Sequence, residues 1–560
     1  MILYNNLRLI CLLYGGRKKF GAVLFLTLAL FFSLACTGGP VHAGDPARTE
    51  EPSYGDTMIT GSLGEASNLI PYLSSDSASS EIAGHFYVAP LKYDKDLNVV
   101  PWAAEHFEIL DEGRLLRFTL RKGILWQDGV ELSTDDVEFT YRKMIDPETP
   151  TAYGGDFRAI KEFRKLDRYR FEVLYEHPFP RSLSTWMGGV WPKHALENQD
   201  LRTTPLIRQP LSCGPYLLSE WQPGARLVLS YNENYFAGRP YIDRLIFRII
   251  PDITTMFLEL KAGKLDLMAS LTALQYLYQA KQDSFAARFN TYRTLASSYT
   301  YLGYNLKSPL FSDVRIRQAL AHAIDKSDII QGALLGQGVP TIGPYKPDAW
   351  AYNTAITDYP HDPAKALELL AEAGWIKGRD GFLEKEGQRF SFTLLTNQGN
   401  EQRIKTAIIL QSQLAKIGIA VTIRSVEWAA FLKQFVMPGH FDAVILAWTL
   451  PHDPDGYDVW HSSRIGNGGL NFVGYADAGA DACLERARST LDQAVRKKEY
   501  DRFQEILHRD QPYSFLYVPY QLSAVDRRFR GIEPAPAGIF YNTDQWWVPL
   551  DEQRYGVQAR

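Results

Sequence analysis

The chain has 560 residues, enough for two or more domains with sizeable hydrophobic cores. Hydrophobic residues make up 46% and charged residues 22%, as in a soluble globular protein, and the net charge of −4 gives no sign of a nucleic acid or an anionic membrane surface as partner. Aromatic residues reach 13%, and such side chains line ligand clefts as well as cores.

The first 43 residues have the pattern of an export leader. Basic residues at 17–19 precede an apolar run at 21–35, which is too short for a comfortable membrane span. Cys36 follows a Leu-Ala pair and resembles the lipidated cysteine of a bacterial lipoprotein, so we favour lipidation there. Cleavage after Ala43 and an uncleaved anchor stay open. All three alternatives place the folded chain in the periplasm or on the outer face of the cell envelope.

A polar stretch with Pro and Gly at 44–56 predicts a flexible tether, so the folded chain starts near Thr57. Beyond the leader only Cys213 and Cys483 remain. Their spacing does not say whether they meet, and a core of this size needs no disulfide, so we expect two buried thiols.

The clearest local pattern lies at 114–145. Polar and apolar residues alternate from Leu116 to Arg121, the period of a half-buried strand. Asp128-Gly129 predicts a turn. Ser133 or Thr134 then begins a helix with two Asp residues in its first turn, where the helix dipole favours negative charge.

Further elements follow along the chain. They are a strand at 165–178, a hairpin broken at Gly224, a buried strand at 246–250, a strand within 261–268, a helix capped by Asp313, a helix at 361–375 closed by Gly374, a helix, Gly418 and strand over 409–428, and a buried strand at 441–448. Helices and strands alternate in much of this, which indicates an α/β protein with partly parallel sheets.

Several of these stretches resemble the family 5 extracellular solute-binding proteins, the dipeptide, oligopeptide and nickel receptors of ABC importers. The segment at 114–145 resembles the family signature, and residues 100–105 resemble the entry into it. Residues 211–252 follow the family nearly residue by residue, and 301–338 form a second specific block. The resemblance covers nearly all of residues 57–530.

This resemblance implies a two-lobed periplasmic binding protein fold (type II) with an extra inserted domain, mixed sheets flanked by helices, and a ligand cleft between the lobes. The implied parts are a leader at 1–43, a tether at 44–56, lobe one at 57–88, 210–298 and 527–560, an inserted domain at 89–209, and lobe two at 299–526.

Enzyme motifs do not appear in the sequence. There is no HExxH, no Gly-x-Ser-x-Gly elbow, no phosphate-binding loop and no CxxC. His361, His440, His452 and His461 lack the spacing of metal ligands. We therefore expect neither catalysis nor a cofactor, although a carboxylate pair for hydrolysis stays possible among so many acids.

The loop that follows the strand ending at Trp448 is the best candidate for ligand contact, because α/β proteins place ligands at strand ends. In peptide-binding relatives an Asp three places past the Trp holds the peptide's ammonium, but that place here is Pro451. Asp453 is the nearest acid. It either contacts ligand or bonds backbone N–H groups of its own loop.

The loop at 397–403 is a second candidate region, because some relatives hold the other end of a dipeptide there with an Arg. Arg403 is nearby, and we favour an exposed position for it on the next helix. Asn397 and Asn400 are alternative hydrogen-bonding partners for a ligand. The remaining candidates are the aromatic residues Trp428, Trp448, Tyr345 and Trp350.

The sequence thus predicts an exported, monomeric substrate-binding protein that closes its lobes over an oligopeptide or dipeptide and delivers it to a membrane permease driven by an ATPase. Oligopeptides are favoured, because no clear Asp and Arg fix both ends of a short ligand. Nickel complexes, oligosaccharides and murein peptides stay open as ligands. The alternatives in other classes are an extracytoplasmic hydrolase and a receptor that signals to a sensor.

Overall fold

The computed structural model describes residues 51–74, 76–151, 153–466 and 469–556. The predicted leader, including Cys36, and residues 44–50 of the predicted tether lie outside the described residues. Within the described ranges, no helix has the length and apolar character needed to cross a membrane.

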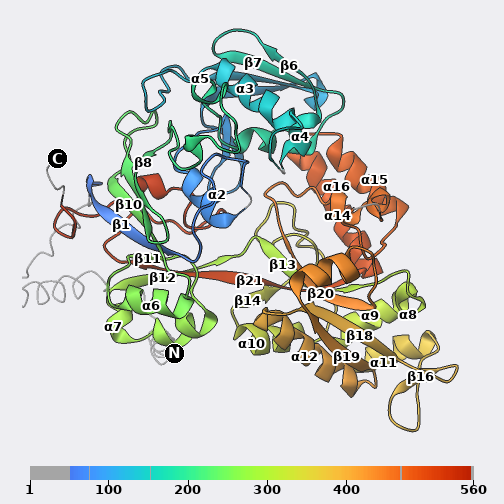
Figure 1. The fold of residues 1–560 in the computed structure, drawn as a ribbon. Helices are drawn as coiled ribbons and strands as arrows, with labels where there is room; N and C mark the ends of the chain where they lie inside the picture. The colour runs from blue at the N-terminus through green and yellow to red at the C-terminus, as the bar shows by residue number, and fades with distance from the viewer. Residues whose placement is uncertain (1–50, 75, 152, 467–468, 557–560) are drawn as a thin grey trace, which may run out of the picture. The chain divides into compact units, whose positions relative to one another are not determined.

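Twelve strands of the described chain join in one continuous set of β-pairings, in the order β19-β18-β20-β13-β21-β11-β1-β10-β9-β8, with β12 and β14 also paired to β21 (Figure 1). The first sheet region comprises β1 (Gly55–Ser62), β8 (Tyr216–Gln222), β9 (Arg226–Tyr231), β10 (Ile242–Ile249), β11 (Leu267–Met268) and β12 (Phe289–Leu295). The second sheet region comprises β13 (Ser298–Tyr304), β14 (Gly338–Pro340), β18 (Ser391–Asn397), β19 (Ala420–Val426) and β20 (Ala443–Thr449).

The long strand β21 (Tyr513–Asp526) links the two regions. Its first half pairs with β13 and its second half with β12. Pro519 lies between these halves and has no N–H to donate, so it fits a point where the pairing partner changes. The chain also passes from β12 to β13 through residues 296–297. These two passages are where the sequence resemblance implies a hinge.

Alternate residues of the second sheet region enter two different cores, as the period of a strand requires. Leu394 and Ile445 belong to one core, whereas Leu395 and Val444 belong to the other. Both faces of this region are therefore covered. In this region β18 runs parallel to both β19 and β20, which confirms the expected α/β class with partly parallel sheets.

A smaller antiparallel sheet follows in the segment 89–209, in the order β4-β5-β7-β6. Its strands are β4 (Ala104–Leu110), β5 (Leu115–Leu120), β6 (Ile160–Lys165) and β7 (Arg170–Tyr175); the short strands elsewhere are β2 (Leu91–Tyr93), β3 (Val99–Pro101), β15 (Ile376–Lys377), β16 (Leu383–Lys385) and β17 (Gln388–Arg389). The predicted strand at 165–178 is wrong in its first part, because a turn between β6 and β7 occupies 166–169. Asp167 accepts the N–H groups of Tyr169 and Arg170, which stabilises that turn.

The helices confirm most of the predicted starts and stops. Ser133 is the N-cap of α3 and forms a capping box with Asp136. Asp313 caps α9, and Gly418 ends α12 at a φ of +86°, where an added Cβ would lie 2.7 Å from the carbonyl oxygen of Gly381. The α-helices are α2 (Ser77–Ala83), α3 (Thr134–Ile145), α4 (Gly154–Arg158), α5 (Lys193–Leu196), α6 (Ile253–Lys261), α7 (Asp283–Ala286), α8 (Pro309–Ser312), α9 (Val314–Ala323), α10 (Lys326–Leu334), α11 (Pro363–Glu372), α12 (Glu401–Lys416), α13 (Trp428–Ala430), α14 (Tyr457–Trp460), α15 (Ala478–Arg488) and α16 (Gln493–Asp510). Two π-helical segments are η5 (Gln275–Gln279) and η6 (Phe431–Val436), and 3-10 turns are η1 (Asp111–Gly113), η2 (Pro180–Ser182), η3 (Ser184–Met187), η4 (Pro205–Ile207), η7 (Ser462–Arg464) and η8 (Thr543–Gln545).

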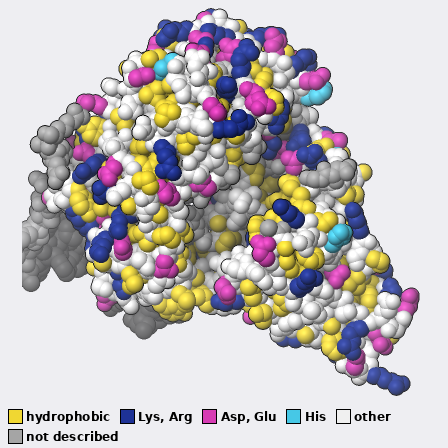
Figure 2. Space-filling view, viewed as in Figure 1, with side chains coloured by type: hydrophobic (Ala, Val, Ile, Leu, Met, Phe, Trp, Pro, Cys, Tyr) yellow, Lys and Arg dark blue, Asp and Glu magenta, His cyan; other side chains and the backbone are white. Residues whose placement is uncertain are grey.

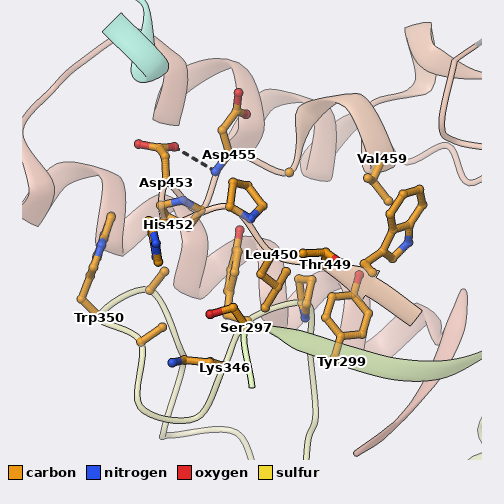
Figure 3. A pocket seen from close by; sticks show the side chains of 18 of the residues that line it. Ser297, Tyr299, Lys346, Trp350, Thr449, Leu450, His452, Asp453, Asp455 and Val459 are labelled. Carbon is orange, nitrogen blue, oxygen red and sulfur yellow. Dashed lines mark hydrogen bonds between the residues drawn. The ribbon is translucent and has the colours of Figure 1, made fainter. Parts of the chain in front are cut away.

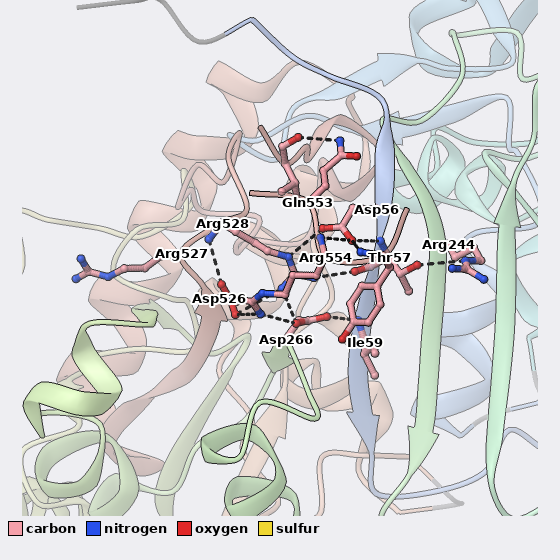
Figure 4. Close-up of polar contacts among 12 residues, drawn as sticks. Asp56, Thr57, Ile59, Arg244, Asp266, Asp526, Arg527, Arg528, Gln553 and Arg554 are labelled. Carbon is pink, nitrogen blue, oxygen red and sulfur yellow. Dashed lines mark hydrogen bonds and ion pairs between the residues drawn. The ribbon is translucent and has the colours of Figure 1, made fainter. Parts of the chain in front are cut away.

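β1 already begins at Gly55, inside the predicted tether, and a buried ion cluster explains why (Figure 4). Arg528, which follows β21, is 3.0 Å from Asp56 and 2.5 Å from Asp266, and all three are almost fully buried. Asp526 accepts from Arg554 near the C-terminus at 2.5 Å. We call these five residues the Arg528 cluster. It fastens the start of β1 to the end of β21 and to the C-terminal segment.

Among the described residues, Cys213 and Cys483 are both buried and unpaired. Cys213 and Cys483 belong to different hydrophobic cores. The other domain boundaries stay predictions.

Candidate functional site

Three neighbouring parallel strands bring most of the predicted site residues to one edge of the second sheet region. In the order β19-β18-β20, Asn397 at the end of β18 pairs with Val426 at the end of β19, and Leu395 pairs with Val444 of β20. Their carboxyl ends therefore meet at one edge, the usual place for ligands in such sheets. In Figure 2 the surface is hollowed between the side that carries β1 and the side that carries β20, with hydrophobic side chains along the latter rim.

A small, mostly apolar cavity lies at the end of β20, and we call it the β20-loop cavity. It measures about 90 Å³, several times the roughly 10–15 Å³ that one water molecule requires. The predicted residues Tyr345, Trp350, Trp448 and Asp453 all line it, so the structure does bring these four together (Figure 3). These four residues are spread over more than a hundred positions, so their spacing in the sequence does not predict that they line one cavity.

Asp453 takes the second of the two roles predicted for it, bonding a backbone N–H of its own loop, and it also pairs with an arginine of the protein. Its carboxylate accepts two hydrogen bonds from Arg496 of α16, at 2.7 and 2.9 Å. It accepts a third from the backbone N–H of Asp455 at 3.0 Å (Figure 3). Burial alone would lower the pKa of Arg496, but the paired Asp453 raises it above its ordinary value. The carboxylate is therefore already neutralised.

Two neutral polar side chains also line the cavity. The hydroxyl of Tyr345 is buried, has no hydrogen-bond partner among the described residues, and stays protonated because burial raises its pKa well above the ordinary value. His452 keeps an exposed surface, but desolvation by the groups around its ring, aided by nearby Lys346, lowers its pKa, so the ring is neutral at pH 7. Such groups can orient a ligand through hydrogen bonds without presenting a charge.

The segment 89–209 also reaches this cavity, which the sequence did not predict. Leu97, in the turn between β2 and β3, lines the cavity wall, and the ring of Tyr93 lies 4.8 Å from the ring of His452. Three parts of the chain that are distant in sequence thus meet here. No local pattern marks Leu97, because its role arises from a contact between residues more than 300 positions apart.

Arg403 forms the second part of the site with the two predicted asparagines. Its guanidinium donates to the side-chain oxygen of Asn397 at 2.8 Å, and Asn400 caps α12 by accepting the N–H of Arg403 at 3.0 Å. The exposed position predicted for Arg403 is wrong. Its side chain is partly buried, and that burial lowers its pKa. Among the described residues, no carboxylate lies within ion-pair distance of it.

Trp428 is the predicted site residue that the structure places apart from both groups. It is 47% exposed and does not line the β20-loop cavity. It begins α13 only two residues after Val426, the partner of Asn397, and therefore lies at the same edge of the sheet. Within the described ranges, no group of three or more His, Cys, Asp or Glu side chains is placed to hold a metal ion.

The protein has a mixed α/β sheet in two regions that share one long strand, with hydrogen-bonding and aromatic side chains at the strand ends. This is the architecture of a solute-binding protein. Residues 98–469 match the model of the bacterial extracellular solute-binding proteins, family 5, and the chain belongs to this family. The fold and the family predicted from the sequence are thereby confirmed.

Individual relatives agree. The oligopeptide-binding protein AppA of Bacillus subtilis is 35% identical over 94% of this chain and 97% of its own length. The structure of that protein in complex with a nonapeptide has a TM-score of 0.71 and covers 89% of this chain and all of that one. NikZ of Campylobacter jejuni in complex with Ni(L-His) has a TM-score of 0.71 at 27% identity, covering 88% of this chain and 99% of its own.

Proposed function

We propose that this protein is the substrate-binding component of an ABC importer and captures oligopeptides. The similarity to AppA over almost the whole length of both chains supports a peptide ligand. The similarity to NikZ shows that nickel complexes bind to the same fold, so the choice of ligand must come from this chain's own site residues.

The observation that carries the proposal is Arg403. A partly buried guanidinium without a counter-ion is unfavourable, whereas a ligand carboxylate would complete it with charge-assisted hydrogen bonds. Asn397 already holds one of its N–H groups and so orients the remainder. The carboxylate at the C-terminus of a peptide has this chemistry.

The other site residues supply apolar and hydrogen-bonding contacts. We propose that Trp448, Tyr345 and Trp350 contact the ligand at the β20-loop cavity, and that Asn397 does so beside Arg403. Trp428 has an aromatic ring 47% exposed at the same edge, and we propose that the ligand covers it. Asp453 and Asn400 act by holding their loops in place, since their side chains bond to the protein itself.

Capture would proceed by closure of the two sheet regions about β21 and residues 296–297, with the ligand stabilising the closed form because only that form contacts it from both sides. The ligand leaves chemically unchanged. The closed form docks on a membrane permease that an ATPase drives. The protein works as a monomer outside the cytoplasm, held at the membrane by a lipid on Cys36, and the mass of the mature N-terminal peptide tests that anchor.

The test of the function uses the full-length mature protein purified without denaturation. Native mass spectrometry should show bound peptides, and a mixed pool of penta- to nonapeptides should raise the melting temperature. Chromatography of the pool after incubation should return every peptide intact. Loss of peptides with appearance of fragments would instead support the hydrolase, and a pool that neither binds nor changes would contradict a peptide ligand.

A further inference from the structure

We infer that the β20-loop cavity receives an uncharged, apolar end of the ligand, so that among peptides an acylated amino end binds in preference to a free ammonium. This inference rests on the proposed function and extends it to the second end of the ligand. Three observations support it. Each charged side chain that lines the cavity already has a partner in the protein, the cavity wall is apolar, and the cavity lies at the same sheet edge as Arg403.

The charged side chains that line the cavity all have partners within the protein. Asp453 is held by Arg496 at 2.7 Å, and Asp455 is held by Arg488 at 2.6 Å. The third charge, Lys346, lies 3.3 Å from Asp348 and donates to the carbonyl oxygen of Pro536 at 3.1 Å. An entering ammonium would therefore have to break an existing pair or remain buried without a counter-ion, and both are unfavourable.

The wall offers what a neutral group needs. Leu97, Leu450 and Val459 contribute apolar surface, and the buried hydroxyl of Tyr345 has no partner among the described residues. A hydroxyl buried in this way gains a hydrogen bond if the ligand brings a carbonyl oxygen. An acyl group combines an apolar body with one such oxygen, and its attachment to nitrogen removes the positive charge of the amine.

The position of the cavity fits a ligand that also reaches Arg403. β18 and β20 are adjacent and parallel, and neighbouring strands lie about 4.8 Å apart. Arg403 follows the end of β18, and the cavity follows the end of β20. A short peptide with its carboxylate at Arg403 can therefore place its other end at the cavity.

The experiment compares one peptide stock in two forms. A mixture of di- to nonapeptides with an apolar first residue is divided, and one half is N-acetylated. Both halves compete for the purified mature protein at pH 7, with bound species identified by native mass spectrometry. The acetylated form should bind roughly tenfold or more tightly. Equal binding, or preference for the free amine, would overturn the inference while leaving peptide capture intact. Binding of neither form would overturn the proposed function itself.

Two variants locate the preference. Arg496→Gln releases the carboxylate of Asp453, so it should shift the preference toward the free amine. Should that variant fail to fold, Val459→Phe fills the cavity and should abolish the advantage of the acetyl group. Val495→Phe is the matched control, because Val495 is 44% exposed and does not line the cavity. An acetyl preference that survives Val459→Phe unchanged would place its cause elsewhere and contradict the inference.

Discussion

Arg528 and Arg403 are both removed from solvent, yet their surroundings differ in kind. Arg528 is almost fully buried and bonds to two buried carboxylates and a backbone carbonyl (Figure 4). Arg403 is partly buried, bonds to one neutral amide, and has no carboxylate partner among the described residues. Burial lowers the pKa of Arg403, whereas at Arg528 the hydrogen bond that its guanidinium donates to Asp266 overcomes the effect of burial and raises the pKa.

This difference separates a part that holds the fold from a part that awaits a ligand. A buried charge is tolerated when it is paired and hydrogen-bonded. In the Arg528 cluster the partners of the buried charge are carboxylates of the chain itself, so the cluster stabilises the fold. Arg403 has no such partner among the described residues, so we propose that the ligand supplies its missing partner.

The largest effect is expected from Arg528→Met. It leaves Asp56 and Asp266 buried without their common partner, which should lower the free energy of unfolding by about 3–5 kcal/mol in chemical denaturation. Arg527→Met is the matched control, because Arg527 is next to Arg528 in the chain but its side chain is exposed. It should change the free energy of unfolding by less than about 0.5 kcal/mol. Similar free energies of unfolding for the two variants would contradict a stabilising role for the Arg528 cluster.

Acid should weaken the same cluster. Burial tends to raise the pKa of Asp526, but the hydrogen bonds from Arg554 and the backbone of Arg528 lower it overall. Its stabilisation is therefore complete above the unfolded pKa of about 3.9 and is lost as pH falls through the lower folded pKa. Unfolding measured between about pH 2 and pH 7 should show this loss in the wild type. An Asp526→Asn profile with the same slope below about pH 4 would contradict it.

Arg403→Met should leave stability within about 1 kcal/mol of the wild type, since it removes a cation that has no ionic partner. Its effect should instead fall on affinity for peptides, by about 1.5–3 kcal/mol in calorimetry, the value of a charged hydrogen bond. Lys405→Met on the exposed face of the same helix provides the control and should bind as the wild type does. A stability loss as large as that of Arg528→Met would make Arg403 a structural residue.

The smallest effect on the fold is expected from Trp428→Ala. The ring is 47% exposed and its nearest aromatic neighbour, Phe431, lies 6.1 Å away, so stability should change by no more than about 0.5 kcal/mol. If the ligand covers this ring, affinity should still fall. Unchanged affinity would remove Trp428 from the proposed contacts.

Local patterns predicted the parts of the fold that local physics decides. The capping box of Ser133, the turn at Gly418, the alternation of β5 and the buried run of β20 depend on neighbours within a few residues, and all were found. The predicted strand at 165–178 was right over β7 but wrong in its first part, because alternation continues across a tight turn, where it carries no information about pairing.

The site was harder to predict because its decisive contacts are not local. Asp453 and Arg496 are 43 positions apart, so the sequence could not show that the acid is already paired. Arg403 was expected at the surface, since the pattern of its helix does not reveal what lies beyond the end of β18. The residues around the Arg403 guanidinium, which are Asn397, Tyr301 and Tyr517, come from three separate strands.

The central claim is that Arg403 awaits a carboxylate from the ligand. The most direct measurement compares one peptide that the wild type binds, with a free C-terminal carboxylate and as its C-terminal amide, in calorimetry against the wild type and Arg403→Met. The account predicts that the wild type binds the carboxylate form about tenfold or more tightly and that the variant binds both forms alike. Equal affinity of the wild type for the two forms would contradict it.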